Sequence, residues 1–253
     1  MKSRSFATFV RLSLWCSVLL AFPLCAQESP HWGYKGEGAP ANWSKLDPAN
    51  AICSAGQRQS PIDIKGAKAS ALLALKFDYK SVPLNITDNG HSIEVGYGPG
   101  STLTVGDKTY VLKQFHFHHP SEEHVNGHAY EMVAHLVHAD ADGHLAVVAV
   151  LFNIGQANAV IDQVWKNIPA KKNQAVDIPG TTLNAKGLLP SDLGYFTFSG
   201  SLTTPPCSED VTWFVMKTPK TLSPDQLAAF AKLYPDNARP IQPTNGREVL
   251  QTK

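Results

Sequence analysis

The sequence predicts a mainly β (α+β) fold, with one domain on a large twisted, mostly antiparallel central sheet and short peripheral helices. Turn signals rich in Gly, Asp and Asn recur along the chain, among them DNGH, YGPGS, VGDK and DADGH. Short alternating or β-branched apolar runs lie between these turns, which is the usual pattern of strands. No internal repeat or low-complexity linker divides the 253 residues, so we expect a single domain.

Residues 1–26 predict a secretory signal peptide. Basic residues open the segment, an apolar run follows at residues 12–22, and Ala26 is the expected last residue before cleavage. The run is too short to span a bilayer comfortably, and no later apolar stretch is long enough. We therefore expect a mature domain of residues 27–253 in the periplasm, without a membrane anchor, with release to the medium as the alternative.

Cysteine usage agrees with export. Cleavage would remove Cys16 and Cys25 and leave Cys53 and Cys207. In an oxidising compartment two remaining cysteines indicate one disulfide, with two buried free thiols as the alternative. A lipoprotein signal ending at Cys25 is a second interpretation of the N-terminus, although Leu24 is bulkier than the residue such signals prefer.

Charge is nearly balanced, with 22 Lys and Arg residues against 21 Asp and Glu residues. A nucleic-acid-binding protein needs a basic surface to collect phosphates. The composition therefore argues against a nucleic-acid partner.

Six strands and two helices can be placed along the chain. The helix at residues 223–234 has the clearest start, with Ser223 as N-cap, Pro224 at the first helical position and Gln226 completing a capping box. The second helix lies at residues 159–168. We expect the strands at residues 91–95, 102–105, 110–118, 132–139, 145–154 and 210–216.

The strand at residues 110–118 carries two histidines on one face. Side chains alternate across a strand, so Gln114, His116 and His118 share a face, and His119 belongs to the other. An H-x-H pair is by itself more often a hydrogen-bonding pair than a metal site, because zinc normally takes at least three protein ligands. If the strand at residues 132–139 pairs with it in antiparallel fashion, His135 can supply the third.

Three neutral imidazoles with a fourth position open are typical of catalytic zinc, which lowers the pKa of bound water to about 7. We therefore predict a Zn²⁺ site. The remaining histidines of this region are expected not to be ligands: His119, His124, His128, His138 and His144.

At this point the chain resembles the α-class carbonic anhydrases, and in particular their secreted bacterial type. The resemblance spans nearly the whole mature chain and implies reversible hydration of carbon dioxide to bicarbonate and a proton, with Zn²⁺ as cofactor. The motifs occur in the family's order: HWGY (31–34), RQSPIDI (58–64), DNGHS (88–92), DGHLAVVAVLF (142–152), FSGSLTTPPCSEDVTWFVM (198–216) and NARPIQP (237–243).

The resemblance assigns roles at the reaction centre. It implies that His116, His118 and His135 bind zinc, and that Thr203 accepts a hydrogen bond from the zinc hydroxide and donates its own to Glu123. This would orient the hydroxide toward substrate.

The resemblance also implies a proton shuttle. His91 would carry the proton that each hydration releases, through water ordered by Tyr34 and Asn89. An unperturbed histidine pKa of about 6.5 suits that task. The alternative is that His91 is only an exposed turn residue.

Further positions follow from the same resemblance. A small apolar pocket for carbon dioxide would consist of Val137, Val147, Leu202, Thr203, Thr204 and Trp213, with Val211 behind it. Gln114 would hold His116, and a backbone carbonyl near Asn237 would hold His118. The resemblance also implies a disulfide between Cys53 and Cys207, which fastens the Thr203 loop, and cis peptide bonds at Pro61 and Pro206.

One residue departs from the family pattern. The family places a glutamate two residues before the third ligand, where it accepts a bond from the ligand's free nitrogen, and here that residue is Val133. Valine cannot accept a hydrogen bond. We expect zinc still to bind, with Glu131 on the same strand face as the candidate substitute for His135.

Two other functions stay open. A non-catalytic anhydrase-like module would be expected to lose ligand histidines, and a periplasmic zinc-binding protein would favour closed coordination; neither matches this pattern. The sequence leaves the oligomeric state open, a homodimer included.

Overall fold

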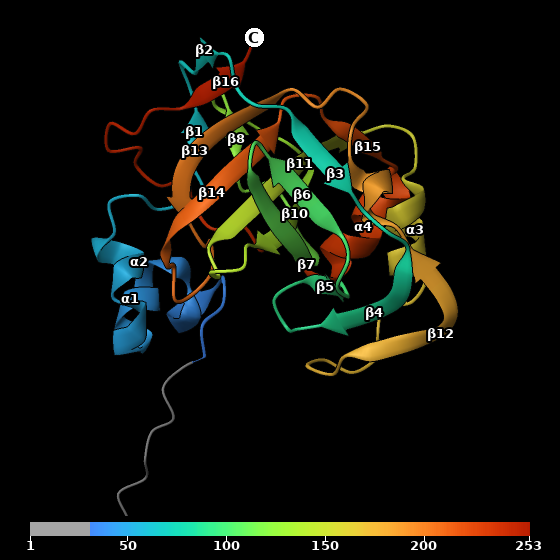
Figure 1. Cartoon of the computed structure of the whole chain (residues 1–253). Helices are drawn as coiled ribbons and strands as arrows, with labels where there is room; N and C mark the ends of the chain where they lie inside the picture. Colours follow the sequence, from blue (N-terminus) through green and yellow to red (C-terminus); the bar gives the residue numbers. More distant parts are fainter. Residues whose placement is uncertain (1–30) are drawn as a thin grey trace, which may run out of the picture.

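The computed structural model describes residues 31–253, so the predicted signal peptide lies outside the described residues (Figure 1). The predicted mainly β fold is confirmed. The strands are β1 (Asp63–Ile64), β2 (Lys68–Ser70), β3 (Leu75–Asp78), β4 (Val82–Asp88), β5 (Ile93–Gly96), β6 (Thr102–Val105), β7 (Lys108–His118), β8 (His124–Val125), β9 (His128–Ala129), β10 (Met132–Ala139), β11 (Leu145–Ile154), β12 (Val176–Leu183), β13 (Tyr195–Ser201), β14 (Glu209–Met216), β15 (Lys220–Leu222) and β16 (Leu250–Thr252).

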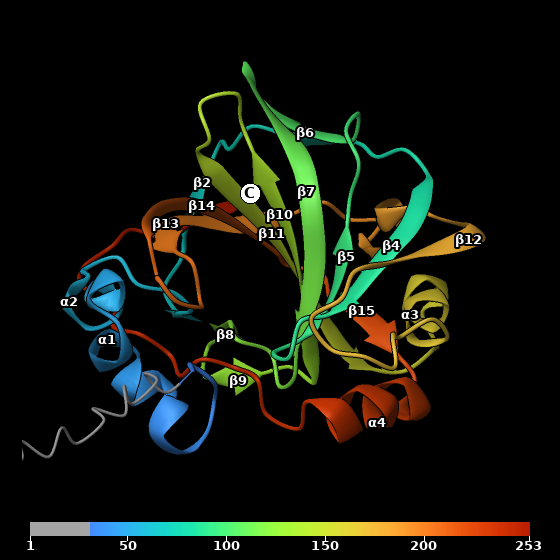
Figure 2. The ribbon, with the colours of Figure 1, turned by 90° about the horizontal axis from the view of Figure 1, so that it is seen from below.

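One twisted sheet of 13 strands organises the described chain, in the order β12-β4-β5-β7-β10-β11-β14-β13-β16-β2, with β3, β6 and β15 attached beside this path. Most neighbours are antiparallel, whereas β11 runs parallel to β14 and β15, and β16 runs parallel to β2. A small sheet of β1, β8 and β9 lies apart. Figure 2 shows β7, β10 and β11 in the middle of the large sheet.

Short helices lie at the periphery, as predicted. Figure 2 shows α3 and α4 at one flank of the sheet and α1 and α2 at the other. The predicted capping box of Ser223 and Gln226 is present at the start of α4. The helical elements are η1 (Gly36–Gly38), η2 (Pro40–Asn42), α1 (Trp43–Leu46), η3 (Pro48–Asn50), α2 (Ile52–Ala55), α3 (Ala159–Trp165), η4 (Ala185–Leu188) and α4 (Pro224–Leu233).

Among the element boundaries that differ from prediction, those of β5 and α3 have clear local reasons. Strand β5 begins at Ile93 rather than His91, because the side chain of Asn89 accepts hydrogen bonds from the backbone N–H of His91 and Ser92 and so forms a turn. Helix α3 ends at Trp165, before the Ile168–Pro169 step. The residue before a proline is disfavoured in helical geometry.

The sheet buries a different core on each face. Phe115, Phe117 and Leu136 belong to a large cluster that α3 and α4 help to cover. Val133 and Val147 belong to a second cluster on the opposite face. Because side chains alternate along β7 and β10, the histidines between these residues point toward the second, smaller cluster.

The N-terminal segment is fastened to the loop before β14. The predicted disulfide between Cys53 and Cys207 is present and joins residues 154 apart in sequence. Both cysteines pack with Trp43 in a third buried cluster. The cis peptide bonds predicted at Pro61 and Pro206 are confirmed, and a third precedes Pro120. No helix in the described part of the chain is long and apolar enough to cross a membrane.

Replacing both Cys53 and Cys207 by serine should lower the free energy of unfolding by about 2–5 kcal/mol, because the disulfide restricts the unfolded chain over a long loop. Urea unfolding monitored by circular dichroism would measure this. The variant, which cannot form this disulfide, should match reduced wild-type protein, which is the control. Equal stability of oxidised wild type and variant would contradict a stabilising role for the disulfide.

Candidate metal centre

Strand pairing brings three histidines together at the centre of the sheet. In the antiparallel pair of β7 and β10, His135 lies directly opposite His116, and Val133 lies opposite His118. One nitrogen from each histidine lies within 4.8 Å of the others. His118 and His135 are each 1% exposed, whereas His116 is partly exposed. The cluster is therefore buried on one side and accessible on the other.

Hydrogen bonds leave one nitrogen of His116 and one of His118 free. His116 Nδ1 donates to Oε1 of Gln114 at 2.8 Å, and His118 Nδ1 donates to the backbone oxygen of Asn237 at 2.7 Å. Both Nε2 atoms are then available inside the cluster. Nε2 of His118 is buried and has no hydrogen-bond partner among residues 31–253. A buried orphan nitrogen beside two other imidazoles fits a metal ion.

The two ring nitrogens of His135 have the opposite roles to those of His116 and His118. Its Nε2 donates to Oε2 of Glu123 at 3.1 Å, which leaves Nδ1 for the cluster. Burial and the neighbouring His135 lower the pKa of His116 to about 3, and the same causes lower the pKa of His118. Burial alone would lower the pKa of His135 too, but the carboxylates of Glu123 and Glu122 together outweigh burial and raise it. His116 and His118 are therefore neutral near pH 7, as metal ligands must be.

Two adjacent carboxylates have different partners, and this corrects the prediction for Thr203. The structure does not contain the predicted pairing of Thr203 with Glu123: Oε2 of Glu123 accepts from His135, and Oε1 has no partner among residues 31–253. The Thr203 side chain instead lies near enough to Glu122 to lower the pKa of that carboxyl. Oε1 of Glu122 accepts a hydrogen bond from the backbone N–H of Arg239 at 2.7 Å. Burial raises the pKa of Glu122 to about 7, opposed by His135 and assisted by Glu123.

Glu131 does not replace the missing glutamate at Val133. Its side chain is exposed, and it makes no hydrogen bond or ion pair among the described residues. Its backbone oxygen instead accepts a hydrogen bond from Nδ1 of His119 at 2.6 Å. The expectation that Glu131 supports His135 is therefore wrong, because its side chain faces solvent.

An apolar wall lies beside the histidines. Val137 pairs with Val147 across β10 and β11, and Val147 pairs with Trp213 across β11 and β14, so their side chains share one face. The ring centroids of Trp213 and His135 are 4.9 Å apart. Val211 is buried in the same cluster. Leu202, which is partly exposed, packs against this cluster. The apolar residues of the predicted pocket are thus brought together as one uncharged surface.

The loop after β13 carries the two threonines. Thr203 is 5% exposed and Thr204 is partly exposed. The backbone N–H of Leu202 donates to the oxygen of Ser208, and that of Cys207 donates to the oxygen of Thr204. These bonds and the Cys53 disulfide fix the loop that holds Thr203.

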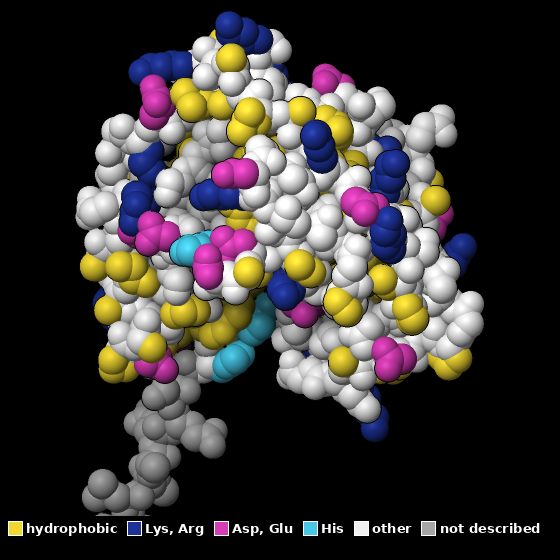
Figure 3. Space-filling model, in the orientation of Figure 1, with side chains coloured by type: hydrophobic (Ala, Val, Ile, Leu, Met, Phe, Trp, Pro, Cys, Tyr) yellow, Lys and Arg dark blue, Asp and Glu magenta, His cyan; other side chains and the backbone are white. Residues whose placement is uncertain are grey.

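His91 lies in a cavity of about 410 Å³ that Tyr34 and Asn237 also line. Its ring stacks on Trp32, with centroids 3.6 Å apart, and its Nε2 is 3.0 Å from Nε2 of His31. Figure 3 shows histidine side chains beside an indentation at the lower edge of this face. Burial, with the positive charges of His31 and Lys172, lowers the pKa of His91 to about 4. The expected unperturbed value of about 6.5 is therefore wrong for this conformation.

Other features of the surface lie outside the predicted site. Asp140, Asp142 and His144 also approach one another, but they lie in a solvent-accessible turn in which His144 Nδ1 donates to Asp140 at 3.0 Å.

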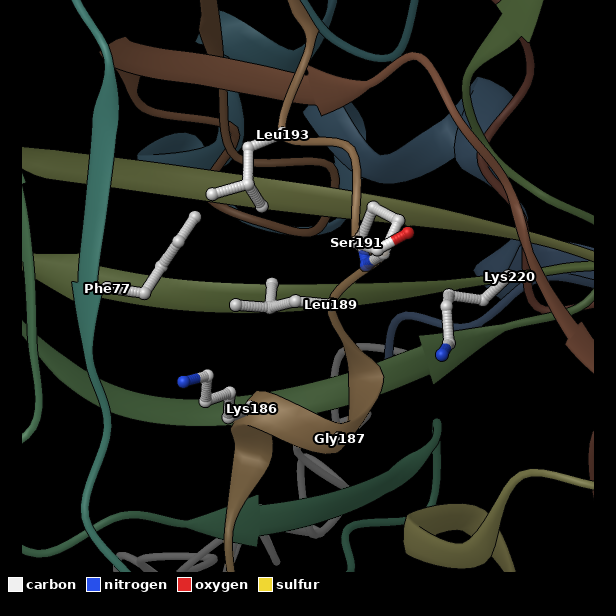
Figure 4. Close-up of a pocket in the computed structure, with 8 residues that line it drawn as sticks. Phe77, Lys186, Gly187, Leu189, Ser191, Leu193 and Lys220 are labelled. Carbon is white, nitrogen blue, oxygen red and sulfur yellow. The ribbon is translucent and has the colours of Figure 1, made fainter.

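A separate pocket of about 500 Å³ contains none of the predicted site residues (Figure 4). It is lined by Phe77, Lys186, Gly187, Leu189, Pro190, Ser191, Leu193 and Lys220.

A large mixed sheet with three clustered imidazoles at its centre defines a β-rich protein with a candidate histidine metal site. A family model described as eukaryotic-type carbonic anhydrase matches residues 38–253. The carbonic anhydrase of Pectobacterium carotovorum is 42% identical over 95% of this chain and 98% of its own length.

Solved structures agree with this match. A hyperthermostable carbonic anhydrase from an active hydrothermal vent chimney has a TM-score of 0.85 at 43% identity, covering 88% of this chain and 100% of its own. The α-carbonic anhydrase of Thermovibrio ammonificans, solved with the inhibitor sulfanilamide, has a TM-score of 0.83 at 41% identity, covering 87% and 98%. The chain belongs to the eukaryotic-type, or α-class, carbonic anhydrase family, whose members are lyases.

Replacing Trp32 by alanine should raise the pKa of His91 from about 4 toward the ordinary histidine value, because burial is the largest cause of the shift. NMR titration of the imidazole C–H resonances would measure it. Lys172→Ala is the matched control and should raise the pKa less, because Lys172 is the smallest of the three causes. A His91 that titrates near 6.5 in the unmodified protein would contradict the stacked arrangement.

Proposed function

We propose that this protein catalyses the zinc-dependent, reversible hydration of carbon dioxide to bicarbonate and a proton. The observation that carries the proposal is the orphan, buried Nε2 of His118 within a cluster of three imidazoles, beside the apolar wall of Val147 and Trp213. His116, His118 and His135 would hold the ion. When bound, zinc lowers the pKa of a water molecule to about 7 and so supplies hydroxide near neutral pH.

The apolar wall would admit the substrate. Carbon dioxide is small and uncharged, and side chains such as Val137 and Val147 offer contact without competing polar groups. Leu202 and Trp213 would close the pocket, and Thr204 would lie at its exposed side. The wall also excludes water from one side of the reacting carbon, which strengthens the electrostatic interactions there.

Thr203 would orient the attacking oxygen. Oε2 of Glu122 is buried and has no hydrogen-bond partner among the described residues, and the Thr203 side chain lies close enough to lower the pKa of this carboxyl. A hydroxyl that donates to Glu122 can only accept from the attacking oxygen, so it fixes the direction of that oxygen's lone pair. This role belongs to Glu122 in place of Glu123.

His91 would carry the released proton to solvent through water near Tyr34 and Asn89. A ring with a pKa of about 4 takes up few protons near pH 7. The relay therefore requires His91 to leave its stack on Trp32 for a more hydrated position, where its pKa approaches the ordinary value.

The setting of this activity is part of the proposal. Residues 1–26 would direct export, and residues 27–253 would form the catalytic domain in the periplasm. The partner would be carbon dioxide and bicarbonate, with no nucleic acid and no membrane after cleavage. The disulfide between Cys53 and Cys207 suits an oxidising compartment.

Stopped-flow measurement of carbon dioxide hydration, with and without a zinc chelator, tests the function. We expect a rate that the chelator abolishes and added zinc restores. His116→Ala should lower the rate by at least about 100-fold, because two histidines are too few to hold catalytic zinc. His128→Ala, an exposed histidine on β9, is the control and should leave the rate unchanged. A protein that binds zinc without any zinc-dependent rate would favour a non-catalytic anhydrase-like module.

A further inference from the structure

We propose that Glu123 is the positioning residue for His135, supplied from a loop because Val133 on the strand cannot serve. The inference rests on the proposed function, since it assumes that His135 binds zinc. Glu123 would touch neither substrate nor metal. It acts by fixing the ring whose other nitrogen faces the cluster.

The contact between Glu123 and His135 is buried and direct. Glu123 Oε2 lies 3.1 Å from Nε2 of His135, and the two residues are 0% and 1% exposed. A histidine that donates one ring N–H to a fixed acceptor has a single tautomer and a fixed ring plane. The bond therefore directs Nδ1 of His135 toward His116 and His118.

Val133 leaves the strand without an acceptor. It is 0% exposed, lies opposite Leu151 on β11, and packs in the apolar cluster that also contains Val215 and Trp213. Glu131, the nearest carboxylate on the same strand face, is exposed. The acceptor for His135 must then enter from outside β10, and Glu123 is the carboxylate that reaches Nε2.

The loop that carries Glu123 is held in place. Ser121 Oγ donates to the backbone oxygen of Glu123 at 2.9 Å and accepts from the backbone N–H of Tyr130 at 2.8 Å. The backbone N–H of Ser121 donates to the oxygen of Tyr130. Immediately after Glu123, His124 pairs with Asp63 in the small sheet. A loop tied on both sides can fix a side chain as a strand does.

Glu122 cannot take over this task. Its Oε1 is bound by the backbone N–H of Arg239, and its Oε2 lies 3.8 Å from Nδ1 of His135, the nitrogen that faces the cluster. Glu123 is also the only carboxyl group among the three acceptors, since His116 and His118 donate to an amide oxygen and a backbone carbonyl. A carboxylate acceptor makes an imidazole a better ligand for a cation.

Zinc release to a chromogenic chelator tests the proposal on full-length mature protein. Glu123→Ala should release zinc about 10–100-fold faster than wild type, which is the usual effect of losing such a partner. Glu123→Gln keeps an oxygen acceptor without the charge and should fall between the two. Glu131→Gln is the matched control, a carboxylate on the same strand face as Val133, and should not change the rate.

Two further measurements separate positioning from general damage. The visible spectrum of the cobalt-substituted protein should change in Glu123→Ala and not in Glu131→Gln, because the spectrum reports the geometry of the ligands. The double variant Glu123→Ala, Val133→Glu should release zinc more slowly than Glu123→Ala, since it returns a carboxylate to the strand. Circular dichroism of each metal-free variant establishes that it folds.

The outcomes distinguish this inference from the function. If Glu123→Ala folds, and its zinc release and cobalt spectrum equal those of wild type, Glu123 is not the positioning residue. If that variant fails to fold, Glu123→Gln decides, and wild-type release would overturn the proposal. A wild-type protein that binds no zinc would instead overturn the proposed function. Normal hydration of carbon dioxide with unchanged zinc release in the variants would leave the function standing and remove this inference.

Discussion

The antiparallel register between β7 and β10 is the constraint on which the site depends. It sets His135 directly opposite His116 and places the histidines of both strands on the face away from Phe115 and Phe117. A shift of one residue would turn His135 into the large apolar core and bring Leu136 to the site. The alternation of apolar side chains on the other face prevents this shift, so the packing that stabilises the sheet also assembles the three-histidine cluster.

Two buried carboxylates complete the centre, and each needs a partner because an unpaired buried charge is costly. Glu122 is 1% exposed and receives the N–H of Arg239, while Glu123 is 0% exposed and receives His135. Adjacent residues of the loop between β7 and β8 therefore have different partners. One carboxylate accepts from His135, a candidate ligand, and the other lies near Thr203.

Asn237 links this centre to the cavity of His91. Its backbone oxygen holds His118, its side-chain oxygen accepts from the N–H of His119, and its side-chain nitrogen donates to the oxygens of His91 and Phe117. The backbone and side chain of one residue, Asn237, thus join residues that are distant in sequence. The relative position of the metal cluster and the proposed proton route is fixed by hydrogen bonds rather than by packing alone.

The sequence alone determined the fold class, the ends of β6, β10 and β11, the capping of α4, and the strand face that carries His116 and His118. These follow from local periodicity and side-chain chemistry. Strand β12, at the edge of the sheet, and strand β16, between β13 and β2, gave no such signal, because they are largely exposed or short and their pairing depends on distant partners. The tertiary structure alone decided which of the adjacent residues Glu122 and Glu123 meets Thr203. It also decided where His135 finds an acceptor and how the stack on Trp32 shifts the pKa of His91. Each of these depends on the direction of a side chain from a loop, which sequence spacing does not fix.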